Sequence, residues 1–383
     1  MPFGQLVIGP PGSGKSTYAY GLYQFMTALE RPIAIVNLDP AAPKPPYPSS
    51  VSITDLISLE DAMDAHKLGP NGAMLYCLEY LEANMDWLED ELERVMHDKG
   101  WTGDKREQAF VVFDTPGQVE LSTDHGSLKR IVERLQKKGR WRRSNNSHAD
   151  GSPTAVGQLA AVHLLDAHHI LDAGKYVALL LLSLRTMLQM ELPHVNVLSK
   201  IDLLSTAGEL PFNLDFYTEV SDLEYLAPLL ERDPRMKRFS ALNKVICEII
   251  QEFGLVSFET LCVEDKDSML RLVRVVDQAL GYVQPAAAQL GDPDHQHGHS
   301  HAHGLTESFP SSISSLYHAS EVQEKWVDHA DAYREFEKSL WQKEGEWAVE
   351  KANEESQRQA GVAPEVIVKE REMRHRDHQS ENA

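Results

Sequence analysis

Short runs of apolar residues alternate with longer amphipathic segments from residue 3 to about residue 283. The uninterrupted apolar runs predict strands buried on both faces, at 5–8, 33–37, 110–113, 160–165, 196–198 and 256–258. The segments between them predict helices at 16–28, 53–66, 73–97, 124–137, 173–190, 243–253 and 266–282. This alternation predicts an α/β fold, in which helices cover both faces of a mostly parallel sheet.

Two stretches break this rhythm. Residues 137–157 are polar and rich in Arg, Asn, Ser and Gly, which predicts a disordered insertion in a surface loop. Beyond residue 283 the composition changes, and five histidines occupy every second position from His295 to His303. Such a tract is more typical of a solvated linker than of a metal site. The sequence therefore predicts a domain at 1–283, a His-rich linker at 284–319 and a charged, helical or disordered tail at 320–383.

Composition and charge narrow the functional classes. The formal net charge of -21 argues against a general nucleic-acid binder, because an acidic surface repels phosphate backbones. The three cysteines (Cys77, Cys247 and Cys262) are far apart and form no CxxC pair, which predicts reduced thiols and no cysteine zinc site. The first residues lack the pattern of a signal peptide, and the most apolar stretch, 177–184, is too short to span a bilayer. We expect a soluble cytoplasmic protein that binds neither nucleic acid nor membrane directly.

The first chemical motif is the run GPPGSGKS at 9–16, directly after the first predicted strand. Glycines let successive backbone N–H groups point at a phosphate, and the helix that begins there adds the positive end of its dipole. Lys15 supplies a cation for the β- and γ-phosphates, and the Ser16 hydroxyl is a ligand for Mg²⁺. The motif predicts a P-loop NTPase whose nucleotide contacts come from Gly12, Ser13, Gly14, Lys15, Ser16 and Thr17.

A second motif follows the buried strand at 110–113. Asp114 stands where a parallel sheet presents residues to a ligand, and it is placed to hold Mg²⁺ through the metal's water shell. Thr115-Pro116-Gly117 turns toward the γ-phosphate, and Gln118 suits the positioning of the attacking water. An aspartate after a strand is also a common helix cap, but the phosphate loop upstream favours the hydrolytic interpretation.

A third motif, Ser199-Lys200-Ile201-Asp202, predicts the base specificity. The lysine stem can cover the purine face, and the Asp202 carboxylate can accept from N1–H and the 2-amino group of guanine. Adenine offers no such pair of donors, so Asp202 would remain unpaired against ATP. Ser199 stands where the fuller motif has asparagine, and the same four residues can also form an ordinary strand-to-loop junction.

Three further segments are candidates for the site. Asp39 can order a water at Mg²⁺, act on the attacking water, or only close the turn before Pro40. Cys262 follows the last predicted strand, where a loop can close over guanine. Gly69-Pro70-Asn71 is a natural turn, in which Asn71 can cap the next helix.

Five of these segments, taken in chain order, resemble the GPN-loop GTPases over about residues 3–283: the phosphate loop, Asp39, Gly69-Pro70-Asn71, Asp114-Thr115-Pro116-Gly117-Gln118 and Ser199-Lys200-Ile201-Asp202. The stretches at 162–204 and 212–220 look most like the second of the family's three eukaryotic paralogues. The resemblance implies a dimeric, Mg²⁺-dependent GTPase in which the tripeptide Gly69-Pro70-Asn71 reaches the phosphates of the other subunit. Asn71 would then act in trans on the γ-phosphate or the attacking water. Glu120 falls where the family carries a further acidic residue near the active site.

The resemblance also implies a cellular role. Members of the family pair as homodimers or with other paralogues, and they act in the assembly and nuclear import of RNA polymerase II. A protein of this kind would be cytoplasmic and could shuttle to the nucleus, with polymerase subunits or assembly factors as partners.

Two alternatives to a GTP-driven switch stay open. One is an ATP-dependent small-molecule kinase, which would need an arginine-bearing lid such as the cluster at 140–143. The other is a scaffold that binds GTP but hydrolyses little, against which Asp114 and Gln118 argue.

Overall fold

The structure, a computed structural model, describes residues 2–118, 126–144, 158–232, 234–282, 322–323 and 326–327. Glu120, the remainder of the predicted insertion at 145–157, the predicted His-rich linker and most of the predicted tail lie outside these ranges. The chain divides into two compact units, Met1–Gln323 and Glu324–Ala383. All of the elements named below belong to the first unit.

Seven parallel strands form one sheet in the order β3-β2-β4-β1-β5-β6-β7. The strands are β1 (Phe3–Ile8), β2 (Ile33–Asn37), β3 (Val51–Ser52), β4 (Phe110–Asp114), β5 (Gln158–Asp166), β6 (His194–Ser199) and β7 (Phe258–Leu261). Because β1 lies in the middle, its carboxyl end opens between those of β4 and β5. That edge of a parallel sheet is the one at which α/β proteins bind ligands.

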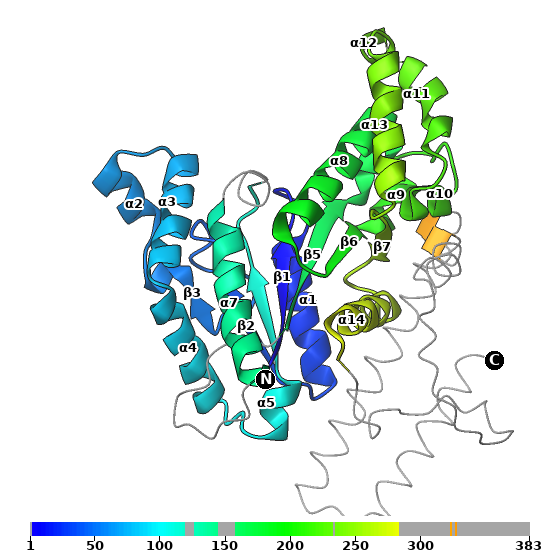
Figure 1. Cartoon of the computed structure of the whole chain (residues 1–383). Coiled ribbons are helices and arrows are strands. Elements are labelled where there is room, and N and C mark those ends of the chain that lie inside the picture. Colours follow the sequence, from blue (N-terminus) through cyan, green and yellow to red (C-terminus); the bar gives the residue numbers. More distant parts are fainter. Residues whose placement is uncertain are drawn as a thin grey trace, which may run out of the picture. The chain divides into compact units, whose positions relative to one another are not determined.

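Helices connect the strands and cover the sheet (Figure 1). The first half of the chain contains α1 (Lys15–Ala28), η1 (Ile53–Asp55), α2 (Leu59–His66), α3 (Pro70–Ala83), α4 (Met85–Asp98), α5 (Asp104–Gln108) and α7 (Gly126–Ser144). The second half contains η2 (Ala167–Leu171), α8 (Ala173–Met190), η3 (Ile201–Leu203), α9 (Leu204–Ala207), α10 (Leu214–Glu219), η4 (Leu223–Leu226), α11 (Ala227–Arg232), α12 (Pro234–Lys237), α13 (Ser240–Phe253) and α14 (Lys266–Leu280).

The sheet has a hydrophobic core on each face. Successive side chains of a strand point to opposite faces, so both faces of a central strand must be apolar. Leu6 and Ile8 of β1 join one core cluster with side chains of α3, α4 and α7. Val7, between them, joins the other with side chains of α1 and α14. The α/β fold with helices on both faces, predicted from uninterrupted apolar runs, is therefore confirmed.

Two predicted helices are each interrupted, and local hydrogen bonds explain both breaks. The segment predicted as one helix at 53–66 is divided into η1 and α2, because the Ser58 hydroxyl accepts a backbone N–H and starts a new helix. The helix predicted at 73–97 ends and restarts at Asn84, whose side-chain amide donates to the Tyr80 carbonyl at 2.8 Å.

The last strand and several short elements also differ from the prediction. The strand predicted at 256–258 shares only Phe258 with β7, since its pairing with β6 begins at Phe258. The sequence prediction missed β3, which has two residues, and the short helices α9 to α12. Elements this short carry too few residues to show a periodicity. None of the helices in the described part of the chain combines the length and apolarity that crossing a bilayer requires.

Two stretches that looked irregular in the sequence are partly ordered. Helix α7 continues to Ser144 and so extends into the predicted insertion. Farther along, Val322 is buried, and the Gln323 side chain accepts from the Leu214 backbone N–H at 2.6 Å. That N–H is one of the unpaired donors at the start of α10, so a residue far along the chain satisfies it.

A buried ion pair joins the start of β2 to α14. One guanidinium nitrogen of Arg31 donates to both carboxylate oxygens of Asp277, at 2.9 and 2.8 Å. The side chains are only 7% and 15% exposed, and the guanidinium lies over the rings of Phe110 and Tyr282. The pair thereby links the segment between α1 and β2 to α14.

We predict that Asp277→Ala lowers the free energy of unfolding by about 3–5 kcal/mol, because it leaves the Arg31 charge buried without its partner. Urea denaturation measures this loss. The matched control is Arg94→Ala, which removes an exposed ion pair with Glu91 and should cost less than about 1 kcal/mol. Equal costs for the two variants would contradict the role given to the Arg31–Asp277 pair.

Candidate functional site

The phosphate loop lies at the carboxyl end of β1, between that strand and α1. Gly12 and Gly14 adopt φ angles of 78° and 89°, which side chains rarely tolerate, so glycine is required at both positions. Lys15 is buried, and its ammonium donates to the carbonyls of Gly9 and Pro10 at 3.0 and 3.1 Å. The loop therefore has the curved backbone and the cation that binding a phosphate requires.

The predicted magnesium residues meet beside this loop. The Ser16 hydroxyl donates to Oδ2 of Asp114 at 2.9 Å. The same oxygen accepts from the Tyr47 hydroxyl at 2.8 Å. The other carboxylate oxygen, Oδ1, is buried and has no hydrogen-bond partner among the described residues. An unpaired buried carboxylate oxygen beside a serine hydroxyl is a donor set that fits a hydrated Mg²⁺ ion.

Burial controls the electrostatics of the site. It lowers the pKa of the Lys15 ammonium, against the charges of Asp114 and Asp39, which raise it. It raises the pKa of Asp114, although the hydrogen bonds from Tyr47 and Ser16 and the charge of Lys15 act in the opposite direction. Burial also raises the pKa of Asp39, although the hydrogen bond from the Ala41 backbone N–H and the charge of Lys15 act in the opposite direction. A divalent cation would offset the desolvation of both carboxylates.

Asp39 lies in the turn around Pro40 and close to the phosphate loop. Its Oδ1 accepts from the backbone N–H of Ala41 at 2.9 Å, so the carboxylate closes the turn around Pro40. Its charge also acts on Lys15 and Asp114, which places it near the phosphate loop and the magnesium residues. The turn thus holds a second carboxylate beside the first.

The loop after β4 lies directly against the phosphate loop. The Thr115 hydroxyl donates to the Val7 carbonyl at 2.8 Å, which fixes the loop to β1. A Cβ atom at Gly117 would stand 2.9 Å from Nζ of Lys15 and 3.1 Å from Cα of Pro11. The absence of a side chain at Gly117 allows this close approach, so the segment from Asp114 to Gln118 lies against the phosphate loop.

Gln118 contacts the Gly69-Pro70-Asn71 tripeptide within the same chain. Its side-chain amide donates to Oδ1 of Asn71 at 2.8 Å. Helix α3 begins at Pro70 with Gly69 at the N-cap, so Asn71 lies in the first turn and does not cap the helix. All three residues of the tripeptide are exposed. The structure therefore joins two of the predicted catalytic residues and leaves the tripeptide at the surface.

The predicted base-binding segment is tied to the phosphate loop. The Ser199 hydroxyl lies 2.7 Å from the Ser13 carbonyl and 3.0 Å from that of Leu165. The Lys200 ammonium contacts the Gly12 carbonyl at 2.5 Å and the carboxylate of Asp166 at 2.8 Å. Ser199 thus links β5, β6 and the phosphate loop, although it stands where the fuller motif has asparagine.

Asp202 and Cys262 come together at the far side of this segment. Burial, followed by the charge of Asp202, raises the pKa of the Cys262 thiol to about 12. The backbone N–H of Cys262 donates to the Ser268 hydroxyl at 3.0 Å, which fixes the loop before α14. The structure therefore brings two residues predicted to lie at the base close together.

Thr17 and Glu120 are the two predicted site residues that remain. Thr17 is exposed in the first turn of α1. Glu120 lies outside the described residues. Two residues that contact the site were missed, Tyr47 and Asp166. Asp166 could have been found as a carboxylate that ends a buried strand, but nothing local in the sequence marks Tyr47.

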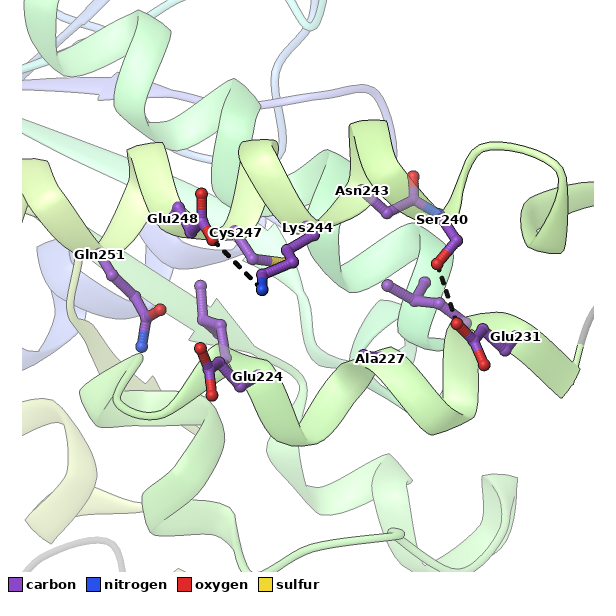
Figure 2. A pocket seen from close by; sticks show the side chains of 11 residues that line it. Glu224, Ala227, Glu231, Ser240, Asn243, Lys244, Cys247, Glu248 and Gln251 are labelled. Atoms are coloured by element: carbon purple, nitrogen blue, oxygen red, sulfur yellow. Dashed lines mark hydrogen bonds and ion pairs between the residues drawn. The ribbon is translucent and has the colours of Figure 1, made fainter.

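A separate cavity lies away from this site. It has a volume of about 260 Å³ and lies between η4–α11 and α13, as Figure 2 shows. Its lining includes Glu224, Glu231, Lys244 and Cys247, and it contains none of the predicted site residues.

The chain is similar to known proteins over most of its length. A family model described as "Conserved hypothetical ATP binding protein" matches residues 7–143 and 150–282. GPN-loop GTPase 2 of Schizosaccharomyces pombe is 42% identical over 347 residues, which are 90% of this chain and 97% of that protein. GPN-loop GTPase 2 of Danio rerio is 45% identical over 328 residues, 86% of this chain and 93% of that protein.

A solved structure supports the fold. The crystal structure of a GTPase from Pyrococcus abyssi in its apo form aligns with a TM-score of 0.54. The alignment covers 72% of this chain and 97% of that one, at 20% sequence identity. At this identity the likeness concerns the arrangement of strands and helices only.

We predict that Ser199→Ala lowers the free energy of unfolding by about 1–3 kcal/mol, because it removes the one O–H donor that the carbonyls of Ser13 and Leu165 share. GDP binding should also weaken, since the Ser13 carbonyl belongs to the phosphate loop. Urea denaturation and GDP titration measure the two effects. Ser240→Ala, which removes a hydroxyl bound to exposed Glu231, is the control. Wild-type stability and GDP affinity in Ser199→Ala would contradict the bridging role.

Proposed function

Because this chain belongs to the GPN-loop GTPase family, we propose that it is a Mg²⁺-dependent dimeric switch in RNA polymerase II assembly and nuclear import. Family membership makes the chain a GTP hydrolase. The likeness to GPN-loop GTPase 2 proteins agrees with the predicted second paralogue. The magnesium requirement, the dimer and the role in RNA polymerase II assembly go beyond membership of the family. Each of these three proposals has separate support.

The magnesium requirement is supported by the buried carboxylate. Ser16 and Asp114 would hold the ion, which would draw charge from the β- and γ-phosphates when bound. Lys15 would leave the loop carbonyls to contact the same phosphates. Gln118 would lie beside the terminal phosphate and orient the attacking water.

The observation that carries the dimer is the exposed Gln118–Asn71 hydrogen bond. A residue that orients a water needs an enclosed surrounding, because solvent weakens every electrostatic contact. Asn71 is exposed, so a second subunit that covers it would supply the missing enclosure. The family resemblance adds that Asn71 acts on the phosphates of the partner, which can be a second copy or another paralogue.

The cellular role rests on the resemblance of the motifs to the GPN-loop family. A switch of this kind would load or release polymerase subunits or assembly factors as its dimer opens and closes. The protein would then act in the cytoplasm and shuttle to the nucleus.

The alternatives are less well supported. A kinase lid would need arginines close to the phosphates, but the cluster at 140–143 lies about 20 Å along α7 from the end that follows Gln118. A GTP-binding scaffold would not need Asp114 and Gln118 beside the phosphate loop.

We predict that Asp202→Asn shifts the preference of the protein from guanine toward xanthine. The C2 carbonyl of xanthine replaces the amino group that Asp202 would bind, and an amide can donate to it. Competition of GTP and XTP against a fluorescent GDP analogue measures the shift. Unchanged selectivity would remove Asp202 from the base site.

We predict that Asn71→Ala slows GTP hydrolysis by about 100-fold and spares GTP affinity. Mixing the Asn71→Ala protein with a second variant shows whether Asn71 acts within its own chain or on its partner. A Lys15→Ala chain should not bind GTP, but it still offers an intact Asn71 to a partner. Adding it to the Asn71→Ala protein should restore hydrolysis if Asn71 acts in trans. No recovery from mixed dimers would mean that Asn71 acts within its own chain, through Gln118.

A further inference from the structure

Tyr47 makes a buried contact that the hydrolysis scheme above does not use. Its side chain is 3% exposed, and its hydroxyl donates to Oδ2 of Asp114 at 2.8 Å. Neither the motifs nor the family resemblance pointed to this residue. Its ring packs among side chains of the core on the α1 and α14 face of the sheet.

The hydrogen bond from Tyr47 determines which oxygen of the Asp114 carboxylate can face a metal ion. Oδ2 of Asp114 accepts from both Tyr47 and Ser16, so two donors occupy it. Oδ1 is buried and without a hydrogen-bond partner in the described ranges, which leaves it to the water shell of Mg²⁺. Ser16 can keep donating to Asp114 while a lone pair of its oxygen binds the ion. The Tyr47 hydrogen bond is therefore compatible with a loaded site.

Tyr47 also belongs to the loop that carries Asp39. The loop between β2 and β3 has prolines at positions 40, 43, 45, 46 and 48, which restrict its backbone. At its start, Oδ1 of Asn37 accepts from the Asp39 backbone N–H at 3.1 Å, while Nδ2 donates to the Ala42 carbonyl at 2.8 Å. The prolines and the two Asn37 contacts restrict this loop at its start. The hydrogen bond from Tyr47 to Asp114 restricts it near its end.

We propose that Tyr47 is a positioning residue for Mg²⁺, whose hydroxyl fixes the Asp114 carboxylate and couples the loop at 38–50 to metal binding. The inference rests on the proposed magnesium requirement. Groups that orient a metal-binding residue without touching the ion typically contribute 10–100-fold to metal affinity. Coupling is reciprocal, so Mg²⁺ must stabilise the Tyr47 contact as much as the contact stabilises Mg²⁺.

The first test is Tyr47→Phe, which keeps the ring and removes only the hydroxyl. We measure the release of a fluorescent GDP analogue over a range of Mg²⁺ concentrations. The variant should need about tenfold more Mg²⁺ than the wild type for half-maximal slowing of release. Release in EDTA should be the same for both proteins, because the contact acts through the metal.

The matched control is Tyr176→Phe, which removes another buried hydroxyl, one that donates to the Tyr217 carbonyl at 3.0 Å. It should keep the wild-type Mg²⁺ requirement even if its melting temperature falls. A Tyr47→Phe requirement within twofold of the wild type would overturn the proposal. If Mg²⁺ does not slow GDP release from the wild type itself, the proposed magnesium requirement fails instead.

A second measurement needs no variant. Hydrogen exchange of the GDP-bound wild type should slow at the amides of residues 41–50 when Mg²⁺ replaces EDTA. The amides of α13, far from the phosphate loop, serve as the reference. Exchange in the loop that is unaffected by Mg²⁺, while GDP release responds to it, would overturn the coupling even if Tyr47→Phe does not fold.

Discussion

The site is organised around one buried carboxylate, Asp114 at the end of β4. Removing a charged group from water is costly, so the structure must surround it with donors and opposite charge. Ser16 and Tyr47 donate to it, and the Lys15 ammonium lies near enough to lower its pKa. These partners come from the phosphate loop and from the loop after β2. A single buried charge thus brings together three segments that are distant in sequence.

At the same edge of the sheet, the segment predicted to bind the base contacts the phosphate loop. Ser199 contacts a carbonyl of the phosphate loop, and Lys200 contacts another. A change at the base would therefore reach the phosphates through the backbone between Gly12 and Ser16. Because both sets of contacts involve rigid strand ends, the nucleotide would meet a largely pre-formed surface.

The central strands and the main motifs of the site could be predicted from the sequence. The features that could not be predicted were missed for physical reasons. Buried parallel strands need uninterrupted apolar runs, so β1, β2, β4 and β5 were found within about two residues at each end. Motifs such as the phosphate loop at 9–16 encode a local backbone shape and were recognisable. Tyr47 and Asn84 were not, because the first acts through a contact 67 residues away and the second through a single side-chain hydrogen bond. The trans role of Asn71 and the identity of the client stay predictions, since they depend on other chains.

The central claim is that this edge of the sheet binds guanine nucleotides and that a second chain completes the active site. Binding of GTP, ATP and XTP to the wild-type protein with Mg²⁺, read together with its oligomeric mass, tests both parts. We expect GTP to bind far more tightly than ATP or XTP, and the GTP-bound protein to have the mass of a dimer. Equal affinity for ATP and GTP, or a monomer that hydrolyses GTP at full rate, would contradict it.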